Sequence, residues 1–315
     1  MRHEHADRYR CPYSGEPLEL MVEESTGSEI LTGSLRSASG MRFPIVDGIP
    51  RLIDLNRETL NDGEKKEQIY YQTTSNTYDS AIHWLFESFY EDEESVRSQI
   101  VQRLELSPHH RVLEIGCGTC CDSVHIARQL SDHGELVLQD LSPNMLAVGR
   151  KKILASQTAQ RQPCAIERFV GNAAYLPFPD HCFDAAFHFG GLNLFTEKKR
   201  TLAELARVVR IGGKVVVGDE SLAPWHRDTL YGNILTNANR LYHHVCPLDC
   251  LPECIRDVCV RWLLGNAFYL IEFRVAAGAP RVDLDLPIPG KRGGTLRTRY
   301  YGTLEGVDPD TKAMA

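Results

Sequence analysis

The residues that most directly predict chemistry lie between Arg111 and Thr119. There a short apolar run carrying one acid, Glu114, leads into Gly116-Cys117-Gly118. The run is typical of a buried parallel strand, and two close glycines let the chain turn sharply and bring bare backbone against a ligand. The turn therefore follows the carboxyl end of a strand, where open α/β sheets bind ligands. Glu114 needs a partner if it is buried.

A second acid ends the next predicted strand, Glu135–Asp140. An acid at this position can accept hydrogen bonds from a ribose diol. The dinucleotide fingerprint is not completed, because Cys121 stands where the third glycine would be, and the loop lacks the Gly-Lys-Ser/Thr of a phosphate loop. The pattern predicts a nucleoside-like ligand with no obvious cradle for phosphates.

The hydrophobic pattern predicts the elements that position these residues. Core strands are expected at 112–115, 135–140, 166–170, 183–188 and 214–219. Helices are expected at about 122–130, at 142–155 with Ser142 as cap and Pro143 in the first turn, at 197–210 ending before Gly212-Gly213, and as a pair within 82–106. Beyond the core we expect a strand from Phe268 and edge strands near Leu296–Tyr301.

Two motifs carry a resemblance to a known family. Val112–Thr119 resembles the first motif of class I S-adenosylmethionine (SAM) dependent methyltransferases, and Asp140–Met145 is similar to the motif that follows it. Phe183–Glu220 resembles the ubiquinone/menaquinone-biosynthesis C-methyltransferases, and the whole resemblance covers about residues 75–220. It implies a Rossmann-like, doubly wound, mostly parallel sheet with helices on both faces. It also implies SAM as cofactor and S-adenosylhomocysteine (SAH) as product.

The resemblance also implies the cofactor contacts. The glycine loop would lie against the methionine part of SAM, and Asp140 would take the ribose hydroxyls. Asn172 stands where the family often has an acid near the adenine amino group, and its amide oxygen can still accept that bond. Tyr78 belongs to a Tyr-Asp segment that helps to cover SAM in related enzymes, although a packing role is an equal alternative. The predicted contacts are Tyr78, Glu114, Gly116, Cys117, Gly118, Asp140, Leu141, Met145, Asn172, Ala173 and His188.

Histidines are the predicted catalytic residues. Methyl transfer is an in-line displacement in which the protein aligns the nucleophile, and a base is needed only when the acceptor loses a proton. His188 ends the fourth core strand, beside the expected methyl group, or else it only caps the strand or touches the cofactor. His226 and His243 lie in an aromatic segment after the fifth strand, which commonly covers the substrate mouth in this fold. Asp219 and Glu220 could also face the acceptor, with structural hydrogen bonding as their expected role.

The N-terminal part predicts a small β-rich unit. It resembles the zinc-ribbon-like domain that is sometimes fused to methyltransferases, but only Cys11 of the usual cysteine pairs is kept. One thiol cannot form a four-ligand zinc site, so we expect a degenerate ribbon that folds without metal, with an unrelated β-extension as the alternative. The predicted division is a ribbon-like unit at 1–55, a SAM-binding core at 56–220, a substrate lid and C-terminal extension at 221–305, and a tail at 306–315.

A row of cysteines follows the predicted lid. Its members are Cys246, Cys250, Cys254 and Cys259. Prolines interrupt a continuous helix here, and metal sites usually use tighter Cys-x-x-Cys pairs. Ordinary buried thiols are the expected state. A metal site, or capture of a soft element such as arsenic, stays open as an alternative.

The composition limits the partners. The 315 residues carry 42 acidic and 35 basic side chains, so the net charge of -7 argues mildly against nucleic-acid binding. No apolar run approaches the roughly 20 residues of a membrane span, and the charged N-terminus lacks a signal-peptide core, so we expect a cytoplasmic protein with reduced thiols. A homodimer is a possible assembly.

These observations predict a SAM-dependent methyltransferase that acts on an oxygen, carbon, nitrogen or sulfur atom of a small molecule. A regulatory or partner subunit that binds SAM or SAH without methyl transfer is one alternative. An arsenic or thiol methyltransferase is another, and a SAM-dependent reaction of a different type is a third.

Overall fold

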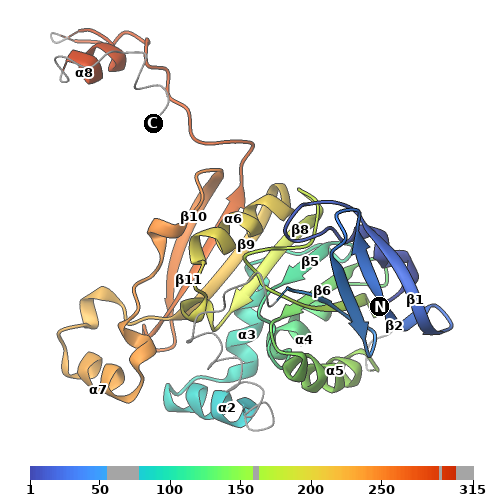
Figure 1. The fold of residues 1–315 in the computed structure, drawn as a ribbon. Coiled ribbons are helices and arrows are strands. Elements are labelled where there is room, and N and C mark those ends of the chain that lie inside the picture. Colours follow the sequence, from blue (N-terminus) through green and yellow to red (C-terminus); the bar gives the residue numbers. More distant parts are fainter. Residues whose placement is uncertain (55–77, 159–162, 291–292, 303–315) are drawn as a thin grey trace. The chain divides into compact units, whose positions relative to one another are not determined.

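The computed structural model describes residues 1–54, 78–158, 163–290 and 293–302 (Figure 1). The chain divides into two compact units, Met1–Ala277 and Gly278–Ala315. The strands of the first unit are β1 (Leu18–Thr26), β2 (Glu29–Ser37), β3 (Arg42–Val46), β4 (Ile49–Leu52), β5 (Arg111–Glu114), β6 (Glu135–Asp140), β7 (Ala165–Gly171), β8 (Phe183–Phe189), β9 (Val209–Glu220), β10 (Ile255–Leu263) and β11 (Phe268–Val275). Its helices are α2 (Tyr78–Ser88), α3 (Glu93–Gln102), α4 (Cys121–Ala127), α5 (Pro143–Thr158), α6 (Lys198–Val208) and α7 (Leu230–Ala238).

All of these strands join one sheet, in the order β1-β2-β3-β4-β7-β6-β5-β8-β9-β11-β10. The central strands β4, β7, β6, β5, β8 and β9 pair in parallel, and the strands at either end pair antiparallel. Crossovers between non-consecutive neighbours are the signature of a doubly wound sheet. The expected Rossmann-like α/β fold is therefore confirmed.

Both faces of the central part of the sheet are buried, and β9 shows this within three residues. Val215 and Val217 belong to the cluster that contains Leu205 of α6, whereas Val216 belongs to the cluster that contains Ile126 of α4. Because successive side chains of a strand point to opposite faces, the helices must cover both sides. The apolar runs noticed in the sequence are the consequence of this two-sided burial.

The N-terminal strands continue the central sheet. Arg51 of β4 lies opposite Val170 of β7 in parallel register, and the ring of Tyr9 packs 6.0 Å from Phe169. Cys11 is buried, with its sulfur 3.7 Å from that of Met41. Among the described residues no group of three or more His, Cys, Asp or Glu could hold a metal. The relationship of this part to a zinc ribbon stays a prediction, as does the four-part division.

Three details differ from the sequence expectations. Residues Leu296–Gly302 form helix α8 in the second unit, so the edge strands expected there are wrong. The helix starts because the hydroxyl of Thr295 accepts a hydrogen bond from the amide of Thr298, 3.2 Å away, which satisfies a donor of the first turn. Strand β10 was not expected, although Gly265-Asn266 beyond it is a hairpin signal. Strand β9 begins directly after α6 and passes through Gly212 with φ of +81°.

Candidate functional site

The glycine loop after β5 has the backbone that its sequence requires. Gly116 and Gly118 have φ of +56° and +52°, a region that side-chain-bearing residues rarely adopt. A Cβ on Gly116 would lie 2.9 Å from Cε1 of His188, whereas a Cβ on Gly118 would meet no atom within 4 Å. The first glycine is therefore required by packing, and the second faces open space.

Two neighbouring side chains at the end of β6 fix this loop. The Asp140 carboxylate accepts hydrogen bonds from the amides of Gly118 and Ser142, each at 2.8 Å. The side-chain oxygen of Gln139 accepts from the amide of Gly116 at 2.9 Å, and its amide group donates to the carbonyl of Gly171 on β7. Gln139 thus ties three parallel strands together at their carboxyl ends. We did not predict it, although a lone amide in an apolar strand was a usable signal.

The Asp140 carboxylate keeps capacity for a ligand. The amides of Gly118 and Ser142 bond different oxygens of this carboxylate, and the amide of Leu141 adds a third hydrogen bond, whereas an ionised carboxylate can accept about four. Burial raises the pKa of Asp140, while hydrogen bonds from Ser142 and Gly118 act in the opposite direction. The arrangement suits a neutral diol that donates two hydrogen bonds.

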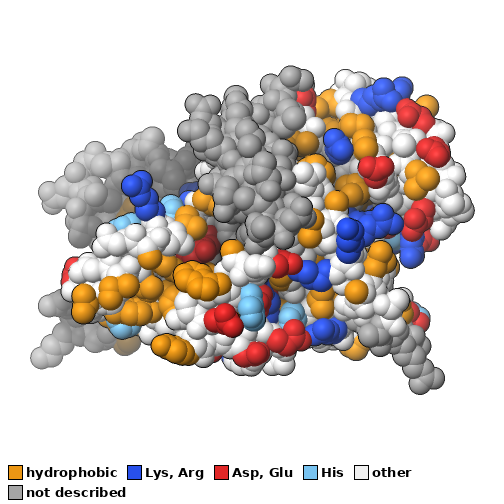
Figure 2. Space-filling model, turned by 90° about the horizontal axis from the view of Figure 1, so that it is seen from below, with side chains coloured by type: hydrophobic (Ala, Val, Ile, Leu, Met, Phe, Trp, Pro, Cys, Tyr) orange, Lys and Arg blue, Asp and Glu red, His pale blue; other side chains and the backbone are white. Residues whose placement is uncertain are grey.

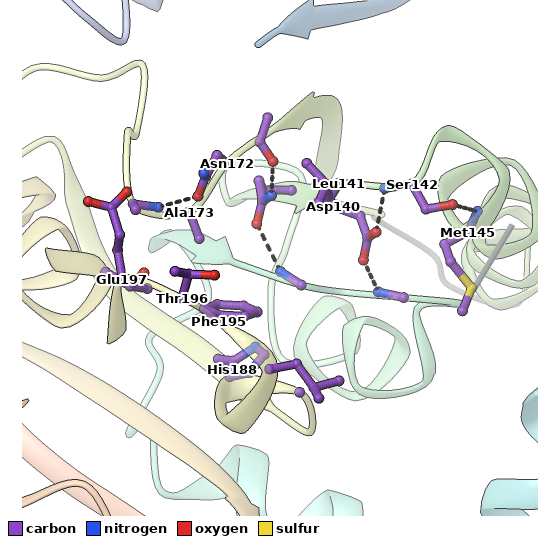
Figure 3. A pocket seen from close by; sticks show the side chains of 18 of the residues that line it. Asp140, Leu141, Ser142, Met145, Asn172, Ala173, His188, Phe195, Thr196 and Glu197 are labelled. Atoms are coloured by element: carbon purple, nitrogen blue, oxygen red, sulfur yellow. Dashed lines mark hydrogen bonds between the residues drawn. The ribbon is translucent and has the colours of Figure 1, made fainter. Parts of the chain in front are cut away.

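The glycine loop, Asp140 and the ends of β7 and β8 surround a first pocket (Figure 3). It is lined by Gly116, Gly118, Gln139, Asp140, Leu141, Ser142, Met145, Gly171, Asn172, Ala173, Ala174, His188, Gly190, Gly191, Leu194, Phe195, Thr196, Glu197 and Thr201. The side-chain oxygen of Asn172 accepts a hydrogen bond from the amide of Ala174 at 2.9 Å. The wall combines apolar contacts with few polar groups, as small-molecule sites do.

His188 is a fully buried wall of this first pocket. Its Nδ1 lies 2.7 Å from the carbonyl oxygen of Ile115, and its ring packs 5.1 Å from that of Phe195. A carbonyl can only accept, so Nδ1 carries the proton and Nε2 is left as an acceptor. No described residue hydrogen-bonds to Nε2. Burial lowers the pKa of His188, which keeps the ring neutral.

Glu114 lies buried beneath the glycine loop and lines neither pocket. Burial, with the nearby charge of Asp122, raises its pKa well above the ordinary value. Asp122 itself is bound by Arg97, whose guanidinium nitrogen lies 2.7 Å from the carboxylate. The Glu114 side chain thus lies in the interior next to Ser123 and Asp122 of α4, so the cofactor contact predicted for it stays a prediction.

A second pocket lies on the other side of the glycine loop. It is lined by Ala81, Ile82, Trp84, Leu85, Phe86, Arg97, Gly116, Cys117, Gly118, Thr119, Cys121, Asp122, Phe189, Gly190, Gly191, Asn193, Leu194, Asp219, Glu220, Asn239, Leu241, Leu264 and Phe268. Five residues line both pockets: Gly116, Gly118, Gly190, Gly191 and Leu194. Four of the five are glycines, so the two spaces are separated mainly by bare backbone.

Most of the predicted site residues lie in the first pocket, and a few lie elsewhere. The first pocket brings together Gly116, Gly118, Asp140, Leu141, Met145, Asn172, Ala173 and His188, and the second contains Cys117. His226 packs against the ring of Tyr231 at 5.3 Å and His243 is exposed, and neither belongs to the described lining of these two pockets. The side chain of Tyr78 lies outside the described residues. Gly190-Gly191, which follows β8 as the first glycine pair follows β5, was a signal that we did not use.

The cysteine row after the expected lid lies against the hydrophobic core. Cys246, Cys250 and Cys254 pack against the same cluster as Leu205 of α6. Burial raises the pKa of Cys246 to about 12. A thiol with so high a pKa is protonated near neutral pH, which fits ordinary packing residues.

Comparisons with known proteins agree with this geometry. The model of the ubiE/COQ5 methyltransferase family matches residues 58–227, more than half of the chain. Demethylmenaquinone methyltransferases of Bacillus cytotoxicus and Bacillus cereus are 35% and 34% identical over 120 residues, 38% of this chain and 48% of each relative. The chain thus spans about half the length of these curated relatives.

A solved SAM dependent methyltransferase from Aquifex aeolicus matches 65% of this chain and 98% of its own length, with 17% identity and a TM-score of 0.45. Within the described residues, no helix combines the length and apolar character needed to cross a bilayer. On the match that covers residues 58–227, this chain belongs to the ubiE/COQ5 methyltransferase family.

Proposed function

We propose that this chain transfers a methyl group from SAM to a small organic acceptor. The observation that carries the proposal is the position of Gly118. Its amide is held by the Asp140 carboxylate at 2.8 Å, and its bare α-carbon borders both pockets. A molecule anchored on Asp140 in the first pocket can therefore present a group to the second pocket across glycine backbone.

The residues of the first pocket fit SAM. Asp140 has lone pairs for the two ribose hydroxyls, Leu141 and Met145 offer apolar contact to a base, and the space beside Gly118 admits a thin chain. When bound, SAM supplies an electrophilic methyl group on a positively charged sulfur. The part of the protein is to orient that group toward the second pocket and to exclude water.

The second pocket fits an acceptor with a flat apolar ring. Its walls include Phe86, Phe189 and Phe268, and the last two rings stack with centroids 5.8 Å apart. Hydrophobic side chains also gather on the surface over α7 and toward α2 (Figure 2), where Trp84 and Leu230 are 67% and 78% exposed. The matched relatives are named for demethylmenaquinone, so a reduced naphthoquinone is the first acceptor to test.

Calorimetric titration with SAM and SAH, followed by assays with SAM carrying an isotopically labelled methyl group, tests the proposal. We expect binding of both nucleosides and transfer of label to 1,4-naphthoquinol kept reduced by dithionite. A panel of amines, thiols, phenols and arsenite covers the other acceptor classes. Absence of SAM and SAH binding would overturn the proposal.

The same measurements distinguish the proposed methyltransferase from a subunit that binds SAM or SAH without methyl transfer. That alternative predicts tight binding of SAM and no labelled product with any acceptor class. Methylation of arsenite or thiols alone would instead indicate the soft-nucleophile alternative.

A further inference from the structure

We propose that Glu220 is the general base of this protein, taking the proton from a ring hydroxyl of the acceptor in the second pocket. The inference rests on the proposed function and deepens it, because it names the residue that takes the proton of the acceptor. Glu220 ends β9 and lines the second pocket together with the glycine loop. It therefore lies on the acceptor side of the shared wall, whereas His188 lines only the first pocket.

The neighbouring Asp219 is committed to holding backbone. Its carboxylate accepts hydrogen bonds from the amides of Gly191 at 3.1 Å, Glu220 at 2.8 Å and Asn193. These bonds fix the loop that carries Gly190-Gly191, two of the residues shared by both pockets. Asp219 is thus a positioning residue, and its carboxyl group also shares a hydrogen bond with the side chain of Glu220. Glu220 lines the second pocket beside it.

The backbone of Glu220 is also fixed. Its amide donates to Asp219, and its carbonyl accepts a hydrogen bond from the side-chain amide of Asn193 at 2.5 Å. The strand end that carries the side chain is therefore held in place, as the support of a catalytic base must be. The loop after β8 and the end of β9 are thus hydrogen-bonded to each other at Glu220.

The surroundings of Glu220 favour uptake of a proton by its carboxylate. Apolar side chains such as Phe268 and Leu264 line the same pocket. Several charged or titratable groups lie around it. They are Asp219 of the same strand, Tyr269 of β11, Tyr242 of the turn Arg240–His243, and Cys121, Arg97 and Asp122 in the lining of the pocket. Arg97 is already bound by Asp122 and Glu93, both at 2.7 Å. Burial, and next the charge of Asp219, raise the pKa of Glu220 well above its ordinary value.

The acceptor hydroxyl gives its proton to the Glu220 carboxylate, and the oxygen keeps the electron pair. That pair forms the new bond to the methyl carbon, either at oxygen or through the adjacent ring carbon, and the electrons of the breaking carbon–sulfur bond stay on sulfur as the thioether SAH. When the ring carbon is methylated, the resulting dienone loses its ring proton to water. Its oxygen takes back the proton from Glu220, which restores both the aromatic hydroxyl and the Glu220 carboxylate.

The test compares Glu220→Gln with wild type and with Glu253→Gln, a matched change at an exposed glutamate outside both pockets. We expect Glu220→Gln to keep SAM affinity within twofold and to lose at least about 100-fold in turnover of 1,4-naphthoquinol, the lower end of the usual contribution of general base catalysis. The acidic limb of the pH–rate profile should disappear in this variant. Retention of turnover within threefold across the profile would overturn the proposal.

A second readout does not depend on turnover. The SAH complex is titrated with 4-nitrophenol, whose ionised form absorbs visible light. Wild type and Glu253→Gln should show the phenolate band of the bound probe at a pH where the free probe and the Glu220→Gln complex do not. Identical spectra for wild type and Glu220→Gln would overturn the assignment of the base, whereas failure to bind SAH would count against the proposed function itself.

Discussion

Lys152 of α5 holds Asp79 in the first turn of α2, with its ammonium nitrogen 2.7 Å from the carboxylate. The same nitrogen lies 3.0 Å from the sulfur of Cys121, and Asp79 also accepts a hydrogen bond from Thr119. Burial alone would raise the pKa of Asp79, but the hydrogen bonds from Lys152 and Thr119 outweigh it and lower the pKa. The helix that lines the second pocket is thus attached to the residue that follows the glycine loop.

Replacing Lys152 by Met should loosen this attachment with little effect on global stability. The two side chains are 31% and 44% exposed, so the ion pair contributes less than about 1 kcal/mol to folding. We expect faster hydrogen exchange in α2 and reduced turnover, while Lys151→Met, a change at the exposed neighbour, leaves both unchanged. Unaltered exchange in α2 of the Lys152 variant would contradict the role of this contact.

Asp140→Ala should weaken SAM binding at least tenfold. Hydrogen bonds to a charged group contribute about 1.5–3 kcal/mol, and the change also removes the acceptor that orients Gly118. Calorimetric titration of SAM measures the effect, with Asp132→Ala at an exposed position as control. Equal affinities of the two variants would argue that the ribose lies elsewhere.

The two glycines of the loop should respond differently to alanine. At Gly118 nothing lies within 4 Å of the new Cβ, so the cost in unfolding free energy is the backbone strain of about 1–2 kcal/mol. At Gly116 the Cβ also meets the His188 ring, which is held by Ile115, so the loss should be larger. Urea unfolding of both variants measures the difference. For SAM affinity we expect the opposite order: relative to its loss of stability, Gly118→Ala should weaken SAM binding more than Gly116→Ala does. Equal ratios in the two variants would contradict a packing role for Gly116 and a ligand-facing role for Gly118.

His188 should make folding stability sensitive to acid. Its folded pKa lies below the ordinary value of about 6.5, because burial outweighs the hydrogen bond to Ile115 and the charge of Asp219. Below about pH 6.5 the unfolded chain therefore binds a proton that the folded chain does not, and this lowers stability until the folded pKa is passed. His188→Gln removes this linkage, so the stability advantage of wild type should narrow between pH 7.5 and 5.5. Parallel unfolding curves over that range would show that the ring titrates normally.

The sequence was sufficient to predict the parallel core. Strands such as Glu135–Asp140 are buried on both faces, so their apolar runs are continuous, and Ser142 and Pro143 start helix α5 as their types predict, with the amide of Met145 donating to the Ser142 hydroxyl at 3.3 Å. Gly116, Gly118 and Asp140 meet because successive strands end at one edge of the sheet. These residues lie within the stretch 58–227 that the family model matches.

Other features depend on contacts that a single sequence does not contain. The different roles proposed for Asp219 and Glu220 depend on which of the two carboxylates accepts hydrogen bonds from the Gly190–Asn193 loop. That pairing is a tertiary contact. Placing His226 or His243 over the site required knowing the path of the chain after β9, where no periodic pattern exists. Gln139 was overlooked because an amide inside an apolar strand breaks the pattern by which the strand is recognised.

The order of the sheet also bears on self-association. Strand β1 forms one margin, and its exposed Glu19 and Glu24 carry the same charge. Two copies aligned antiparallel along that margin would oppose carboxylates to carboxylates, and like charges directly across a strand pair repel. A symmetric dimer built by extending the sheet through β1 is therefore disfavoured, and a twofold assembly of this chain would need to bury a helical or loop surface instead.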